Sequence, residues 1–175
     1  TLTLTLTLTS TLTLTLTLTL TLTIGKVGAA LALIAAGKDG EAQRLLADFV
    51  QSDKVTVVAM ESCEFCWTIF KLLRAIGVEY EALHFDALQY APNNMGNVIR
   101  ASVQELTGEK TFPQVFVGGK FFGGAADACI AWKKGELQPV LEAAGAKPDD
   151  EWNGYTGDPF EFLPKWMTKN PLRSK

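Results

Sequence analysis

The stretch VVAMESCEFCWTIF, from Val57 to Phe70, joins a β-branched run to the start of an amphipathic helix and places two cysteines at the junction. Cys63 falls in the loop before the expected helix, and Cys66 falls about one turn into it. A helix start exposes backbone N–H groups and a partial positive charge, which stabilise a thiolate. A second cysteine three positions later can reach back and resolve a mixed disulfide. The pattern predicts that Cys63 is an exposed nucleophile and that Cys66 is the more buried resolving thiol.

Two other interpretations of the cysteine pair stay open at this point. A zinc site needs four ligands, and only Cys129 and His84 are available to complete a Cys₃His set. Their positions show no second paired motif, so we favour a buried side chain for Cys129 and a structural strand residue for His84. Alternatively, Cys63 and Cys66 are two inert core side chains, but that interpretation leaves their position across a helix start unexplained.

The composition narrows the class of protein. The 175 residues are enough for one ordinary domain with appendages. Lysine and arginine number 16 against 19 aspartate and glutamate, so there is no basic surplus that would indicate a nucleic-acid partner. Three cysteines are too few and odd in number for a secreted disulfide scaffold. The chain is therefore expected in a reducing intracellular compartment.

The segment 1–38 consists of a Thr-Leu repeat followed by an apolar leader, with Lys26 as its only charge before Lys38. Alternation with period two would suit an aggregation-prone strand. The absence of acidic residues suits a removable plastid or mitochondrial targeting leader, and the length would allow a membrane anchor. We favour either a low-complexity repeat without packed structure or a targeting leader.

The segment 39–146 is predicted to be a single α/β domain. Apolar positions at helical spacing and short β-branched runs give the order helix, strand, helix, strand, helix, strand, strand, helix. Gly118-Gly119 joins the last two strands as a hairpin turn. The first strand-helix-strand unit predicts a parallel pair. The expected result is a four-stranded mixed sheet with helices on both faces. The predicted ranges are helix 41–51, strand 54–60, helix 66–76, strand 78–85, helix 97–106, strands on either side of Gly118-Gly119, and helix 125–134.

Four features occur in order along the chain: VTVVAMESCEFC, the later stretch LTGEKTFPQVFVGGKFFGG, Asp127 and KKGEL. On these features, the chain resembles the glutaredoxin family from about residue 39 to 145. The resemblance implies a thioredoxin-like fold and a glutathione-linked thiol-disulfide oxidoreductase, with Cys63 and Cys66 catalytic and disulfide-containing proteins as clients. It also implies a cis bond before Pro113 and pairing of the Phe112 backbone with glutathione. The residues that it implies for glutathione binding are Phe65, Lys110, Thr111, Phe112, Pro113, Gly124, Ala126 and Asp127.

Four positions depart from the family pattern. Met60 stands where the family usually has a lysine that pairs with a glutathione carboxylate, and Glu64 follows the first cysteine in place of proline or a small residue. Phe65 replaces the common tyrosine, and Ala126 with Asp127 keeps only one of the two acidic residues usual after the double glycine. Because a glutathione-bridged [2Fe–2S] cluster needs those contacts, we expect no cluster and no other metal site. The lost lysine, the halved acidic pair and the aromatic tail motivate an alternative function, a weakly active or redox-inactive thioredoxin-fold subunit of a larger assembly that could be associated with a membrane.

The segment 147–175 is rich in aromatic residues and carries four prolines. Proline at this density disfavours long helices and central strands. The aromatic side chains have two interpretations: the tail wraps back over the domain, or it docks onto a partner protein. The residues alone leave both open.

Overall fold

The computed structural model describes residues 40–51, 55–148 and 150–168. The Thr-Leu segment, with its alternatives of repeat, leader and anchor, lies outside the described residues. The helices are α2 (Gly40–Val50), α3 (Glu64–Ala75), α4 (Met95–Thr107), α5 (Ala125–Lys134), α6 (Leu137–Ala143) and α7 (Lys165–Thr168). The strands are β1 (Val55–Ala59), β2 (Tyr80–His84), β3 (Gln114–Val117) and β4 (Lys120–Gly123). Short 3₁₀ helices span Leu88–Tyr90, Pro92–Asn94, Glu151–Gly154 and Pro159–Phe162.

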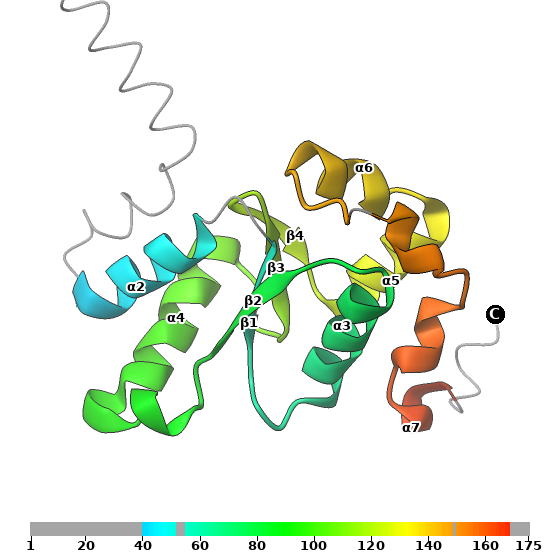
Figure 1. The fold of residues 1–175 in the computed structure, drawn as a ribbon. Coiled ribbons are helices and arrows are strands. Elements are labelled where there is room, and N and C mark those ends of the chain that lie inside the picture. Colours follow the sequence, from blue (N-terminus) through cyan, green and yellow to red (C-terminus); the bar gives the residue numbers. More distant parts are fainter. Residues whose placement is uncertain (1–39, 52–54, 149, 169–175) are drawn as a thin grey trace, which may run out of the picture.

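The strands form one four-stranded mixed sheet in the order β2-β1-β3-β4. β1 and β2 are parallel, with Ala59 opposite His84, while β3 is antiparallel to both β1 and β4. Helices α2 and α4 pack on one face, and α3 and α5 pack on the other (Figure 1). This arrangement confirms the α/β fold class and the four-stranded mixed sheet predicted from the sequence. Among the described residues, no helix is both long and apolar enough to cross a bilayer.

The central strand β1 is buried on both sides, because its alternating side chains enter two separate cores. Val55 and Val57 pack toward α3 and α5, and Val58 packs toward α2 and α4. The continuous β-branched run that predicted this strand is thus explained by burial at every position. One consequence is that the loop after β1, which carries Cys63, leaves a strand that is buried along its whole length.

Two details of the helix prediction were wrong. Helix α3 begins at Glu64 rather than at Cys66, because Cys63 itself occupies the N-cap position. Helix α6 was missed altogether, because the last predicted helix ended at residue 134. It tolerates Pro139, which lies in the first helical turn, where its missing N–H has no intrahelical partner to lose.

The tail folds back on the face of the sheet that α3 and α5 cover (Figure 1). Leu163 is 3% exposed, and the rings of Trp152, Tyr155, Phe160 and Phe162 pack against the same core as α3 and α5. The Thr68 hydroxyl donates a hydrogen bond to the Phe162 carbonyl at 2.8 Å, which ties the tail to α3. Short helical turns replace long helices, as the proline content predicts.

Candidate active site

The two cysteines of the motif lie at the N-terminus of α3. Cys63 is the N-cap residue, and its sulfur accepts a hydrogen bond from the Cys66 backbone N–H at 3.4 Å. This geometry directs a free helix-end donor at the sulfur and stabilises negative charge there. Cys63 is partly exposed, whereas Cys66 is fully buried. Burial, together with hydrogen bonding to Cys63, raises the pKa of the Cys66 thiol well above its usual value.

The loop before Cys63 is held by groups from two neighbouring elements. The Glu61 backbone N–H donates to both carboxylate oxygens of Asp86, at 2.9 and 3.1 Å. The indole N–H of Trp67 donates to the Glu61 carbonyl at 2.9 Å. Asp86 follows β2 and Glu61 follows the parallel strand β1, so both lie at the carboxyl edge of that strand pair. These contacts fix the entry of the chain into the helix that carries the thiols.

The segment before β3 supplies the opposite side of the site. The Phe112–Pro113 peptide bond is cis, and the Cys63 thiol donates to the Phe112 carbonyl at 3.8 Å. The buried Gln114 side chain holds this segment, since its amide donates to the carbonyl oxygens of Glu109 and Thr111 at 2.9 and 3.3 Å. The Phe112 backbone is therefore placed beside the nucleophilic sulfur by groups that belong to the sheet.

The start of α5 lies next to this segment. Gly123 has φ of 148°, and a Cβ atom there would meet the Cβ of Asp127 at 2.8 Å, so glycine is required for both conformation and space. The Asp127 carboxylate accepts the Gly124 N–H at 2.8 Å and caps the helix. A Cβ on Gly124 would come within 3.4 Å of the Pro113 carbonyl oxygen, which places the double glycine against the cis-proline segment.

Most of the predicted site residues lie in a connected set. Cys63, Phe65 and Phe112 pack against the same core cluster that contains Cys66. Pro113, Gly124 and Asp127 follow through the contacts given above, with Ala126 partly buried at the second position of α5. Thr111 and Lys110 are exposed, and within the described part of the chain the Lys110 ammonium makes no hydrogen bond or ion pair. Their role in ligand binding stays a prediction.

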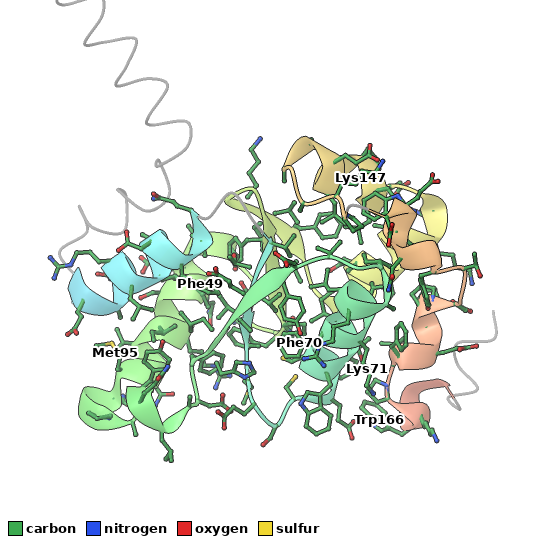
Figure 2. The ribbon with its side chains drawn as sticks, in the orientation of Figure 1. Phe49, Phe70, Lys71, Met95, Lys147 and Trp166 are labelled. Carbon is green, nitrogen blue, oxygen red and sulfur yellow. The ribbon has the colours of Figure 1, made fainter. Side chains whose placement is uncertain are left out.

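Sequence reasoning missed a tail residue that contacts the motif. The indole N–H of Trp166, on α7, donates to the Glu64 carboxylate at 2.7 Å. The same indole meets the Phe65 ring edge-on, with centroids 5.9 Å apart. Trp166 thus contacts both residues between the two cysteines (Figure 2 labels its position beside α3). It is separated from Glu64 by 102 positions, so no local pattern could have indicated the contact.

Cys129 lies outside this site. It is buried in the middle of α5, and its thiol donates to the Pro159 carbonyl of the tail at 3.6 Å. Burial raises its pKa to about 11, with a smaller contribution from the charge of Asp158. The structure therefore places Cys129 as the buried small side chain that the sequence predicted.

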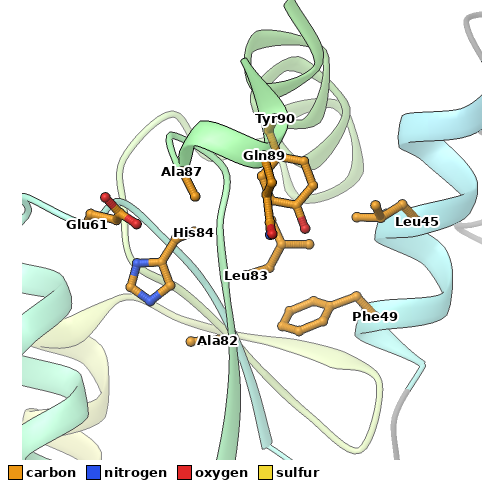
Figure 3. A pocket seen from close by; sticks show the side chains of 9 residues that line it. All are labelled: Leu45, Phe49, Glu61, Ala82, Leu83, His84, Ala87, Gln89 and Tyr90. Atoms are coloured by element: carbon orange, nitrogen blue, oxygen red, sulfur yellow. The ribbon is translucent and has the colours of Figure 1, made fainter. Parts of the chain in front are cut away.

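His84 lies near the site, but among the described residues no recorded contact joins its ring to either thiol. Its ring centroid is 5.7 Å from that of Phe70, and it borders a hollow of about 520 Å³ with Glu61, Tyr90 and Phe49 (Figure 3). Neither cysteine lines this hollow. In the described ranges, no three His, Cys, Asp or Glu side chains are grouped as metal ligands would be.

Comparison with known proteins gives one consistent result. A family model described as Glutaredoxin matches residues 55–122, from β1 into β4. Mouse mitochondrial glutaredoxin-2 is 32% identical over 102 residues, which cover 58% of this chain and 62% of that protein. A glutaredoxin from Ricinus communis is 33% identical over 99 residues, which cover 57% of this chain and 92% of that protein.

A solved structure agrees with these sequence matches. The crystal structure of a buckwheat glutaredoxin–glutathione complex superposes with a TM-score of 0.53 at 29% identity. The superposition covers 61% of this chain and 91% of the buckwheat chain.

Proposed function

This chain belongs to the glutaredoxin family, whose members are thiol-disulfide oxidoreductases with a thioredoxin-like fold, and from that premise we propose that Cys63 and Cys66 reduce protein disulfides and glutathione mixed disulfides. The observation that carries the proposal is the hydrogen bond from the Cys66 N–H to the Cys63 sulfur at the start of α3, beside the Phe112 carbonyl. A partly exposed thiol with a helix-end donor suits nucleophilic attack, and a buried one behind it suits resolution.

The reaction proceeds by two exchanges. The Cys63 thiolate attacks one sulfur of the substrate disulfide, forms a mixed disulfide, and displaces the other sulfur as a thiolate that takes up a proton. Cys66 then loses its proton and attacks the Cys63 sulfur. This releases the second substrate thiol and leaves a Cys63–Cys66 disulfide. Two glutathione molecules reduce that disulfide and become glutathione disulfide. With a glutathione mixed disulfide as substrate, Cys63 takes up the glutathionyl group and releases the substrate thiol. One further glutathione then attacks the glutathionyl sulfur, which gives glutathione disulfide and restores the Cys63 thiolate.

Because burial raises the pKa of Cys66, this thiol stays protonated while Cys63 reacts first. The order of attack therefore follows from position: the exposed sulfur at the N-cap is the nucleophile, and the buried sulfur acts second. The proposal thus keeps the roles that the sequence analysis expects for the two cysteines.

Glutathione is the proposed co-substrate, and the Phe112 backbone is the proposed strand-like partner of its peptide. Support comes from the cis Phe112–Pro113 bond beside Cys63 and from the buckwheat relative, whose structure is a glutathione complex. The remaining proposed contacts are Phe65, Lys110, Thr111, Pro113, Gly124, Ala126 and Asp127. Asp127 already accepts the Gly124 N–H through one oxygen, so the proposed ligand contact uses the other.

We keep the expectation of a protein without a [2Fe–2S] cluster, because Met60 cannot supply the charge that a lysine would offer to a bridging glutathione. Protein purified under anaerobic conditions should show no visible absorbance band. We place the activity in a reducing compartment, cytoplasmic or organellar, where the three free cysteines would stay reduced.

A glutathione-coupled disulfide-reduction assay tests the proposal. Cys63→Ser should lose activity to the background rate, while Cys129→Ser, a matched change in a buried thiol of the same domain, should keep at least half of it. Equal rates for the native chain and Cys63→Ser would contradict the proposed oxidoreductase activity. They would favour the alternative, a redox-inactive subunit that docks onto partner proteins.

A further inference from the structure

We propose that Trp166 is a positioning residue of the dithiol site, which uses its indole N–H to hold the Glu64 carboxylate and so limits how strongly that charge opposes the Cys63 thiolate. The inference rests on the proposed function, in which Cys63 is the nucleophile. It concerns a tail residue that lies outside the range matched by the family model, 55–122.

Immediately before this contact, the tail is anchored by features that do not involve the cysteines. Leu163 and Pro164 are buried immediately before α7. The Phe162 carbonyl accepts from the Thr68 hydroxyl, one turn along α3 from Glu64. Trp166 itself is 62% exposed, so burial of its own ring does not explain its position. The contacts that define it are the hydrogen bond to Glu64 and the edge-on contact with Phe65.

Glu64 follows Cys63 directly and is the first residue of α3. A carboxylate beside a thiolate disfavours the charged sulfur, because like charges repel. An N–H donor at 2.7 Å offsets part of the carboxylate charge and fixes its direction. Without that donor, the full carboxylate charge would repel the negative charge on the Cys63 sulfur. A smaller fraction of Cys63 would then be thiolate at neutral pH.

The test is a double-mutant cycle on the full chain, read out by the rate at which iodoacetamide alkylates Cys63. Trp166→Phe removes the N–H and keeps an aromatic ring against Phe65. Glu64→Gln keeps an acceptor oxygen and removes the charge. Trp152→Phe is the matched control, because Trp152 also belongs to the tail but packs edge-on against Trp132, away from the motif.

Trp166→Phe should slow alkylation about twofold at neutral pH, a small effect because Glu64 is exposed. Glu64→Gln should speed it, and Trp166→Phe should add nothing in the Glu64→Gln background. At a pH high enough to ionise Cys63 fully, all variants should react at the same rate. Trp152→Phe should match the native chain throughout.

Three results would overturn the inference: no change or faster alkylation in Trp166→Phe, an equal slowing in both Glu64 backgrounds, or a slowing that persists at high pH. The second and third would mean that Trp166 acts through ring packing or access. Alkylation reports on Cys63 itself and does not require disulfide reduction. If the chain fails to reduce disulfides, the proposed function is wrong, but the alkylation rates still test the role of Trp166.

Discussion

Cys63 at the start of α3 and Cys129 within α5 belong to two helices that pack together on the same face of the sheet, yet they differ in solvent exposure and in position relative to a helix end. Cys63 is at the N-cap of α3, partly exposed, with a backbone N–H directed at its sulfur. Cys129 is in the middle of α5, buried beneath the tail, with its thiol donating to the Pro159 carbonyl. From this comparison we expect position relative to a helix end and to solvent to determine which thiol reacts.

The largest expected difference between the two sites is in chemical labelling. With the reduced native chain at pH 8, iodoacetamide should modify Cys63 at least tenfold faster than Cys66 or Cys129, because both of those thiols are buried and their pKa values are raised. Peptide mass spectrometry after timed quenching measures the three rates. As a control, the three cysteines should label at similar rates in urea. Similar rates in the native chain would contradict the expected difference between Cys63 and Cys129.

The second difference concerns the cover over Cys129. Leu163→Ala should lower the free energy of unfolding by about 2–4 kcal/mol, because Leu163 is 3% exposed and its removal leaves a cavity under the tail. Urea denaturation measures the change. Leu88→Ala is the matched control: Leu88 is 90% exposed, and its loss should cost less than about 0.5 kcal/mol.

The same variant sharpens the comparison of the thiols. If the tail is what shields Cys129, Leu163→Ala should speed Cys129 labelling in the native state while leaving Cys63 the faster thiol. A stability equal to that of the native chain would mean that the tail contributes little to the fold.

The third difference is a pH dependence of stability. The Cys129 thiol ionises near pH 9.0 when unfolded but only near pH 11 in the folded chain, because burial raises its pKa. The unfolded state therefore loses its proton first as the pH rises. The contribution of this thiol is present in full below pH 9.0 and is lost as the pH approaches 11.

Cys129→Ala should consequently show a smaller decline in unfolding free energy over that pH range, by up to about 2 kcal/mol. Urea denaturation of both chains at several pH values measures the difference between them. Parallel declines would show that Cys129 ionises no later in the folded chain than in the unfolded one.

The sequence was most informative where structure is local. The strand, loop and helix around Cys63 were predictable because β-branched residues, a helix start and apolar spacing all occur within a few turns. Asp86 could have been found as well: it follows the second predicted strand, and residues that follow adjacent parallel strands lie at the same edge of a sheet.

Local sequence patterns could not predict contacts between residues far apart in the chain. The bond between Trp166 and Glu64 depends on how the whole tail packs over α3, and the aromatic residues of the tail fitted either folding back or docking onto a partner. The tail's position over Cys129 depends on the same packing. Both features become visible only in the folded chain.

The most direct test of the central claim is to trap the mixed disulfide. In a Cys66→Ser chain, which cannot resolve it, one equivalent of glutathione disulfide should leave a single glutathionyl group on Cys63, identified by peptide mass spectrometry. Cys129 should remain free in the same sample. An adduct on Cys129 in place of Cys63, or no adduct while the folded Cys63 thiol stays free, would contradict the account.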